Sequence, residues 1–418
     1  MTAAAQSGAP VRGALSHIRV LDLSRVLAGP WAGQTLGDLG AEVIKVERPG
    51  TGDDTRLWGP PFLKDDQGQP TNDSAYYLCT NRNKQSITVD LTLPAGQALI
   101  RDLAKTCDVV IENFKVGSLR QYGLDYEALR EINPRLVYCS ITGFGQTGPY
   151  APRAGYDFLI QGMGGLMSIT GRPDGEPGEG PTKVGVALTD ILTGLYACTA
   201  ILAALEARNV NGQGQHIDLA LLDVGVACLA NQGMNYLYSG QTPHRMGNAH
   251  PNTVPYQDFP TADGYMILAI GNDGQFAKFC TVTGKPEWFD DERFRTNEAR
   301  VQHRGTLIPL MRQATVMRTT GEWIALLEQV GVPCGPINTI ADVFADPQVQ
   351  ARGMQFQMQH PVAGDIPLVA SPIRMSGTPV QYRSAPPRLG QDTQAVLSRL
   401  LGLSQATIDE LAQKGVLG

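Results

Sequence analysis

Short apolar segments alternate with amphipathic ones through the first third of the chain. Residues 17–24 predict a strand, residues 28–40 have small and apolar positions at helical spacing, and residues 41–50 predict a second strand. The alternation continues in predicted strands at 86–91, 108–114 and 135–145 and predicted helices at 94–106 and 126–133. Because these strands are almost continuously apolar, the pattern predicts an α/β fold with a parallel sheet covered by helices on both faces.

Ligands of parallel sheets gather at the carboxyl ends of the strands. The segments expected there are DLSRVLAGP, VERPGTGDDTR, ENFKVGSLR and TGFGQTGP. The turn AGPWAG does not match the GxGxxG motif of dinucleotide-binding folds, and Glu47 is followed at once by Arg48. The pattern therefore predicts a binding crevice at this edge and argues against a nicotinamide dinucleotide.

The second half of the chain begins with the apolar stretch GVALTDILTGLYACTAILAALEAR at residues 185–208, which predicts a buried core helix. The composition then changes to a Pro-, Asn- and His-rich segment that introduces further strands and helices. We therefore expect a large domain from residues 15–232 and 352–418 and a smaller α/β domain from residues 233–351. A hairpin-like segment and a helical C-terminus are predicted after it.

Composition and charge narrow the classes of function. The 418 residues have a net charge of −6 with scattered basic positions, which argues against a nucleic-acid partner. The seven cysteines stand singly, as expected of a reduced cytoplasmic protein. The six histidines have no metal-ligand spacing, so we predict no metal. Asp190 and two glycines interrupt the long apolar stretch, so we predict no membrane span.

Asp190 stands near the start of that stretch, among apolar residues, where a charge is costly unless it is hydrogen-bonded or paired. One interpretation is an N-cap residue, which stabilises a helix by about 1 kcal/mol. The other is a nucleophile, because a helix N-terminus favours the ionised carboxylate, and such a group can attack an acyl carbon in water-poor surroundings. The two interpretations are compatible, and the residues alone leave both open.

Other polar residues are candidates for binding. Tyr156 precedes a predicted helix, where a tyrosine is typically a packing residue with a tethered hydroxyl. Arg48, Lys84 and Arg120 fall near predicted strand ends, where they would together hold phosphates, although each alone is typically a solvated charge. Arg245 lies in an irregular loop between two histidines and is a candidate partner for a substrate carboxylate.

Many stretches in one order resemble the class III CoA-transferases. They include DLSRVLAGPWAGQTLGDLGAEVIKVERPGTGDDTRLWGPPF, NRNK, VIENF, RAGYD, GVALTDILTGLYA, GQGQHIDLALLD and PYQDFPTADGY. The resemblance runs from about residue 15 to the C-terminus. It implies a Rossmann-like large domain and a smaller domain, with two identical chains forming an interlocked-ring homodimer.

The resemblance also implies the site residues. Asp190 falls at the position of the nucleophile, coenzyme A and acyl-CoA are substrates, and no cofactor is permanently bound. The implied CoA contacts are Val26, Ala28, Arg48, Lys84, Asn113, Phe114, Arg120 and Tyr156, and the substrate contacts are Gly271, Asn272 and Gly274, with Arg245 as the candidate for a distal carboxylate. Leu27 stands where formyl-CoA transferase has Gln, which argues against formate and oxalate as substrates.

The implied reaction moves CoA from an acyl-CoA to a carboxylic acid through a covalent aspartyl anhydride and thioester. The resemblance is closest to members that act on succinyl-CoA and glutarate, so we expect succinyl-CoA as donor and a dicarboxylate or analogue as acceptor. The alternatives are an α-methylacyl-CoA racemase, which shares the fold, and a non-catalytic acyl-CoA-binding protein. Tyr156 stands in place of the histidine of the racemase GHD motif, and tyrosine is a poor base near neutral pH.

Overall fold

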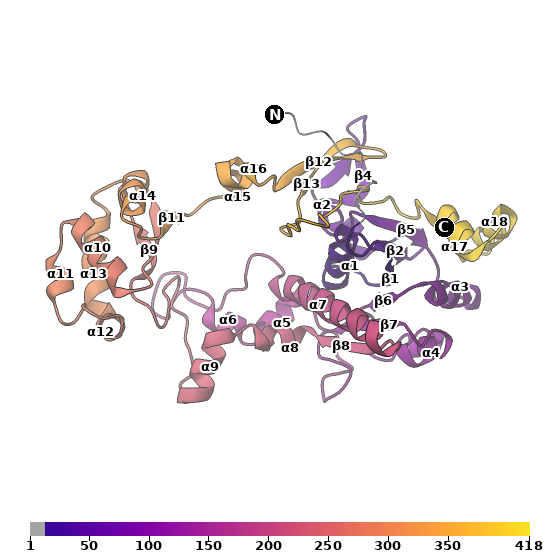
Figure 1. Ribbon diagram of the computed structural model, residues 1–418, viewed down its shortest axis with the longest axis horizontal. Coiled ribbons are helices and arrows are strands. Elements are labelled where there is room, and N and C mark those ends of the chain that lie inside the picture. The colour runs from indigo at the N-terminus through magenta and orange to yellow at the C-terminus, as the bar shows by residue number, and fades with distance from the viewer. Residues whose placement is uncertain (1–12) are drawn as a thin grey trace. The chain divides into compact units, whose positions relative to one another are not determined.

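The computed structural model describes residues 13–418 and divides into two units, whose elements are labelled in Figure 1. Unit 1 comprises the described residues up to Leu166, Val184–Met234 and Gln348–Gly418, and unit 2 comprises Met167–Lys183 and Asn235–Pro347. Each unit has its own buried apolar core.

Unit 1 is built on a six-stranded parallel sheet in the order β5-β2-β1-β6-β7-β8. The strands are β1 (Arg19–Asp22), β2 (Glu42–Glu47), β5 (Lys84–Thr88), β6 (Val109–Glu112), β7 (Val137–Thr142) and β8 (His216–Ala220). This is the strand order of the doubly wound nucleotide-binding folds, and it reverses between β1 and β6. Such a reversal opens a crevice at the carboxyl ends of the two strands, where chain crossovers diverge to opposite faces.

Helices cover both faces of this sheet. Successive strand residues point to opposite faces, so neighbouring residues of β1 pack into two different cores. Val20 packs into a core with α1 (Ala28–Asp38), α5 (Asp157–Met163), α7 (Leu188–Asn211) and α8 (Leu221–Ala227). Leu21 packs into a second core with α3 (Pro94–Thr106), α4 (Tyr126–Ile132), α17 (Thr393–Leu401) and α18 (Gln405–Gln413). The predicted α/β fold with both faces of a parallel sheet covered is thus confirmed.

Shorter elements decorate unit 1. They are η1 (Asp54–Leu57), β3 (Phe62–Lys64), β4 (Pro70–Ser74), α2 (Ala75–Leu78), η2 (Arg120–Tyr122), β12 (Gln355–His360) and β13 (Gly364–Val369). Three further helices, α6 (Leu166–Ile169), α9 (Ala230–Ser239) and α16 (Pro347–Ala351), each include residues of both units. The antiparallel pairs β3–β4 and β12–β13 form two hairpins.

By length and composition alone, α7 could cross a membrane. Among the helices of residues 13–418, it is the one that meets this criterion. In unit 1 it packs against α1, α5, α8 and β7. At Gly194 a Cβ atom would lie 2.7 Å from the carbonyl oxygen of Ala28, so the glycine allows the first turn of α1 to approach closely. This helix therefore belongs to the core of unit 1.

Unit 2 has a three-stranded antiparallel sheet in the order β11-β10-β9. Its elements are β9 (Tyr256–Pro260), β10 (Tyr265–Ala269), α10 (Asp273–Thr283), α11 (Glu287–Asp290), α12 (Asn297–Gln302), α13 (Arg304–Thr315), α14 (Thr320–Gln329), β11 (Cys334–Pro336) and α15 (Ile340–Ala345). Phe276, Phe279 and Trp323 are among the fully buried residues of its core.

Unit 2 also takes residues 167–183, which the sequence assigned to the large domain. The reason is a set of contacts with the loop that contains Arg245. Gly247 donates its backbone N–H to the Gly171 carbonyl at 3.1 Å, and Arg245 Nε donates to the Arg172 carbonyl at 3.1 Å. Arg245 also forms an ion pair with Asp174. These long-range contacts have no signature in the hydrophobic pattern.

Candidate active site

The crevice at the end of β1 is shaped by a strained turn. Val26 has a φ of 72°, a left-handed conformation that costs a β-branched residue about 1–3 kcal/mol. Asn113, which directly follows β6, holds Arg25, the residue before Val26. Its side chain accepts from the Arg25 N–H at 2.9 Å and donates to the Arg25 carbonyl at 2.6 Å. The Val26 N–H points to the Asp53 carboxylate, at 3.2 and 3.3 Å from its two oxygens. Asn113 and Asp53 therefore hold this turn across the point where the strand order reverses.

Behind the turn lies a buried ion pair between Lys45 and Asp53, at 2.8 Å. Lys45 also donates to the Ser24 carbonyl at 3.0 Å, so it ties β2 to the end of β1. Burial alone raises the pKa of Asp53, but the Lys45 charge and hydrogen bonds from Lys45 and Thr55 outweigh it and lower that pKa to about 2. The Asp53 carboxylate is therefore a fixed anion beneath Val26.

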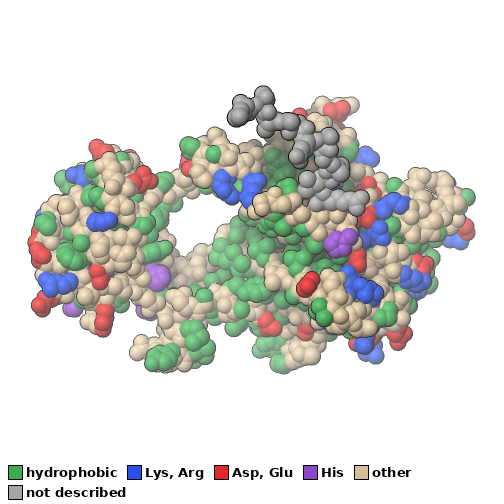
Figure 2. All heavy atoms as spheres, in the orientation of Figure 1, with side chains coloured by type: hydrophobic (Ala, Val, Ile, Leu, Met, Phe, Trp, Pro, Cys, Tyr) green, Lys and Arg blue, Asp and Glu red, His purple; other side chains and the backbone are tan. Residues whose placement is uncertain are grey.

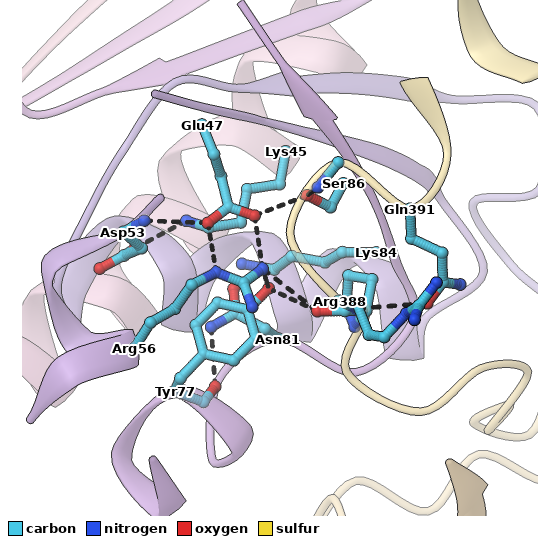
Figure 3. A network of polar contacts seen from close by, with 12 residues as sticks. Lys45, Glu47, Asp53, Arg56, Tyr77, Asn81, Lys84, Ser86, Arg388 and Gln391 are labelled. Carbon is cyan, nitrogen blue, oxygen red and sulfur yellow. Dashed lines mark hydrogen bonds and ion pairs between the residues drawn. The ribbon is translucent and has the colours of Figure 1, made fainter. Parts of the chain in front are cut away.

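The pair continues into a larger network around Arg56, shown in Figure 3. Arg56 binds the Glu47 carboxylate through two hydrogen bonds of 2.8 and 2.7 Å and forms an ion pair with Asp73. Its guanidinium also lies 3.7 Å from the centre of the Tyr77 ring. Glu47 and Tyr77 both turn toward this guanidinium, which links η1, β2 and α2 behind the crevice.

The structure corrects the sequence prediction for Lys84. Its ammonium is fully buried, 2.9 Å from Asp22 and 2.9 Å from the Pro30 carbonyl oxygen. Burial lowers its pKa to about 8, against the opposing effect of Asp22. With no surface to offer a phosphate, Lys84 is a core ion-pair residue, and its predicted contact with CoA is not retained.

The other residues that the sequence assigned to CoA lie in unit 1. Arg48 follows β2 and Arg120 begins η2; both are exposed, and neither has an ion-pair partner within residues 13–418. Ala28 is buried as the first residue of α1. Phe114 follows β6, and its ring centre lies 5.6 Å from the guanidinium carbon of Arg25. Two exposed cations and a half-buried aromatic ring thus follow strands of the same sheet.

A cavity of about 240 Å³ lies beside Phe114 and Arg120. Its lining includes Glu112, Ser140 and His216, whose ring nitrogen is 2.9 Å from the Ser140 hydroxyl. Burial raises the pKa of Glu112 to about 7, although hydrogen bonds from Ser140 and the Phe114 N–H act in the opposite direction. Glu112 is a buried carboxyl that the hydrophobic pattern places in a strand without indicating any role for it.

Asp190 is half-buried in the first turn of α7. The residue before the helix is Ala187 and no side chain of that residue caps it, so the N-cap interpretation of Asp190 is wrong. Burial, and then the negative charge of Asp157, raise the pKa of Asp190 to about 7. Burial and the charge of Asp157 therefore make the ionised form of Asp190 less favourable than it is for an exposed aspartate, although a pKa of about 7 still leaves much of it ionised near neutral pH.

The cap of α7 comes from Asp157 instead. The Asp157 carboxylate accepts from the Thr189 N–H at 2.8 Å, from the Thr189 hydroxyl and from Gln161 Nε2 at 2.7 Å. Its neighbour Tyr156 has 65% of its surface exposed and makes no capping bond to α5. The sequence gives one signal for Asp157, which is an aspartate at the start of an apolar helical segment. Nothing in the local sequence indicates that Thr189 is its partner.

Tyr76, on α2, is a second group, besides Asp157, whose electrostatics are coupled to Asp190. Burial, followed by the charges of Asp190, Cys79 and Asp157, raises the pKa of the Tyr76 hydroxyl to about 12. Its ring packs edge-on against Trp58, with the ring centres 5.3 Å apart. The nucleophile candidate is therefore near a neutral phenol, and no cation is among the groups that shift its pKa.

The residues assigned to the acyl substrate lie in unit 2. Asn272 caps α10, accepting from the Gln275 N–H at 2.9 Å, and Gly271 donates to the Gln275 side chain at 2.8 Å, with Gly274 in the first turn of the helix. Arg245 lines a cavity of about 1010 Å³ within this unit. Residues 13–418 contain no group of His, Cys, Asp and Glu side chains that would hold a metal ion.

Comparison with known proteins identifies the family. The model of CoA-transferase family III matches residues 15–393. The chain is 55% identical to the succinate–glutarate CoA-transferase of Agrobacterium fabrum over 92% of its own length and 95% of that protein, and 46% identical to the human succinyl-CoA:glutarate CoA-transferase over 96% and 90%. A crystal structure of a CAIB/BAIF family protein from Brucella suis superposes with a TM-score of 0.81 at 53% identity, covering 94% of this chain and 99% of that one. The chain belongs to CoA-transferase family III and is a CoA-transferase.

Proposed function

We propose that this enzyme transfers CoA from succinyl-CoA to glutarate or a related dicarboxylate, with Asp190 as the covalent nucleophile. One observation carries the assignment to Asp190. It is a half-buried carboxylate, it has neither a hydrogen-bond donor nor a cation partner within residues 13–418, and its pKa is raised to about 7. A carboxylate without such partners retains its lone pairs for an acyl carbon. The named activities of the relatives support the choice of donor and acceptor.

In the proposed mechanism, the Asp190 carboxylate attacks the thioester carbonyl of succinyl-CoA and expels CoA thiolate, which leaves a mixed anhydride. The thiolate attacks the Asp190 carbonyl, releases succinate and forms an aspartyl-CoA thioester. The acceptor carboxylate attacks that thioester and expels the thiolate again, giving a second anhydride. The thiolate then attacks the acceptor acyl carbon, and the departing group is the Asp190 carboxylate. One thioester and one carboxylate stand on each side, so the exchange balances without ATP.

We propose that CoA binds at the crevice between β1 and β6. Val26, Ala28, Asn113 and Phe114 surround the strained turn there, and the exposed Arg48 is available to a phosphate. Arg120 extends the same edge of the sheet. A large handle held far from the thioester lets binding energy position the reacting carbon.

We propose Arg245 as the partner of the distal carboxylate, and Gly271, Asn272 and Gly274 as neighbours of the acyl group. The Arg245 guanidinium already pairs with Asp174, whose side chain is 79% exposed and therefore free to give way to a substrate anion. Arg245→Ala should raise KM for dicarboxylate acceptors about tenfold or more and leave monocarboxylates unchanged, since only the former carry a second charge. Equal effects on both classes would remove this assignment.

We further propose that two copies assemble as an interlocked-ring dimer in the cytoplasm. Figure 2 shows hydrophobic side chains gathered over the part of unit 1 that contains α5 and α7. Exposed apolar residues on these two helices are Phe158, Leu159, Met163, Leu195, Tyr196 and Leu202. Exposed apolar residues gathered on one surface are typical of protein–protein interfaces, which supports the proposed dimer. All seven cysteines are free, which suits a reducing compartment.

The decisive experiment combines a panel of carboxylic acids with succinyl-CoA, read by mass spectrometry, with a search for a hydroxylamine-sensitive adduct on Asp190. The proposal predicts acyl exchange for a dicarboxylate and an adduct that disappears in Asp190→Asn. Neither exchange nor adduct would favour a non-catalytic acyl-CoA-binding protein. Exchange of the α-proton of a 2-methylacyl-CoA without transfer would favour the racemase.

A further inference from the structure

The charge and contacts around Thr189 and Asp190 point to a second carboxylate with a part in the reaction. Asp157 is the first residue of α5 and is buried. Both of its oxygens are engaged by neutral donors, one by the Thr189 N–H and hydroxyl and the other by Gln161. Gln161 is itself fixed, because its side-chain oxygen accepts from the Val184 N–H at 2.9 Å. The carboxylate is thus held in one position without a neutralising cation.

This position controls the backbone that carries Asp190. The first turn of a helix leaves four N–H groups unsatisfied, and the residue before α7 is an alanine that supplies no side-chain acceptor. Asp157 satisfies the N–H of the residue directly before Asp190. Thr189 is further anchored because its carbonyl accepts from the Thr193 hydroxyl at 2.6 Å. A shift of Asp157 would therefore move the start of α7 and the Asp190 carboxylate with it.

We propose that Asp157 is a positioning residue of the transfer reaction: it places Asp190 by holding the start of α7, and its negative charge keeps Asp190 a strong nucleophile. This inference rests on the proposed function of Asp190. A more basic carboxylate attacks an acyl carbon faster, following Brønsted behaviour. The raised pKa of Asp190, to which Asp157 contributes after burial, agrees with that geometry.

Among residues 13–418, Asp157 is the one charged group that shifts the pKa of Asp190, which makes its effect measurable. The α2 helix contributes Tyr76, whose pKa of about 12 keeps it neutral in the working range. The α1 helix packs against α7 one turn after Asp190, where the uncharged Ala28 carbonyl and Trp31 lie against Gly194. The α8 helix has one charged residue, Asp223, which is exposed and is absent from the causes of the Asp190 shift.

The test is the rate of adduct formation on Asp190 in a single turnover with succinyl-CoA, followed from about pH 5 to pH 9. In Asp157→Asn, an amide oxygen still accepts from the Thr189 N–H while the charge is lost. We expect the acidic limb of the rate profile to move down by about one pH unit and the rate at about pH 8 to fall about threefold. Asp102→Asn is the matched control, since it removes a half-exposed carboxylate on α3, and its profile should equal that of the wild type.

Asp157→Glu supplies the complementary variant. It keeps the charge but cannot keep the same reach to Thr189, so the limb should stay in place while the rate falls about tenfold. Thermal melting of each variant separates a folding defect from a rate defect, and the Asp157→Glu comparison still decides the matter if Asp157→Asn does not fold. A wild-type profile in Asp157→Asn, or a wild-type rate in Asp157→Glu, would overturn the proposal. If the wild type forms no adduct at all, it is the proposed function that fails.

Discussion

Unit 1 contains carboxylates in two contrasting settings. Behind the crevice, Asp53 and Glu47 are buried against Lys45 and Arg56, and their pKa values are lowered despite burial. In the first turn of α7, Asp190 is less buried, yet its pKa is raised to about 7 because no cation balances burial and the charge of Asp157. Burial alone therefore does not set the pKa of these three carboxylates. The pKa is lowered where a cation lies beside the buried carboxylate and raised where none does.

The difference agrees with the role proposed for each region. The network around Arg56 ties β2, η1 and α2 together and supports the strained turn at Val26, so its charges are satisfied within the protein. In the proposed mechanism, Asp190 exchanges covalent partners during the reaction, and a permanent ion pair would oppose that exchange. Substitutions at four positions test this difference between the paired and the unpaired carboxylates.

The largest effect is expected at Asp190. Asp190→Asn should lower kcat about 1000-fold or more, since no other residue replaces a covalent nucleophile. The same change should raise the free energy of unfolding at about pH 8. The sign follows because a raised folded-state pKa gives stability that is present below the unfolded pKa and lost as pH rises through 7. Steady-state kinetics and urea unfolding check the two halves. A variant that loses both activity and stability would contradict the contrast.

The opposite pattern is expected at Arg56. Arg56→Leu leaves Glu47 and Asp73 buried without their partner and should cost about 3–5 kcal/mol of unfolding free energy. The folded-state pKa of Glu47 is lowered, so its contribution is present above the unfolded pKa and lost as pH falls. The deficit of the variant should therefore shrink toward about pH 4. Urea midpoints measured across pH check this, and a deficit that does not depend on pH would assign the loss to packing.

Much of this fold follows from its hydrophobic pattern. The strands before and after α1 were predicted because continuous apolar runs flank an amphipathic one, and such local signals survive in the structure. The hairpin β3–β4 was not predicted, since PTNDS and FLK lack an alternating apolar face. Asp190 was found through its place in an apolar run and through resemblance to a family.

The pairing of charges could not be predicted, because it depends on contacts distant in sequence. Lys84 was expected at a phosphate, yet its partner Asp22 lies 62 residues away and the sheet brings the two side chains together. Asp157 reaches Thr189 over 32 residues. Hydrophobic periodicity indicates which face of an element a residue occupies. It does not indicate which charged or polar side chains will pair with one another.

A smaller effect tests the same rule at Glu112, whose pKa is raised to about 7 by burial without a cation. Its ionisation destabilises the fold as pH rises from the unfolded pKa through 7. Glu112→Gln keeps the size and an acceptor for the Phe114 N–H. Relative to the wild type, the variant should therefore gain up to about 3 kcal/mol between about pH 5 and pH 8. Asp102→Asn should show no such trend. Equal stabilities of Glu112→Gln and the wild type at both pH values would mean that an unrecognised partner stabilises the ionised form of Glu112.

The smallest effect is expected at Val26, where the ion pair of Lys45 and Asp53 supports a left-handed backbone. Glycine adopts that conformation without strain, whereas alanine keeps the strain and loses packing. Val26→Gly should therefore change the unfolding free energy by less than about 1 kcal/mol, with Val26→Ala the less stable of the two, the reverse of the usual order. Urea unfolding of both variants gives the order directly. KM for succinyl-CoA should rise severalfold in the glycine variant, because the turn is then less rigid. An alanine variant more stable than the glycine variant would contradict the idea that the Lys45–Asp53 pair supports a strained turn. The structural support of this region would then be assigned to the Arg56 network alone.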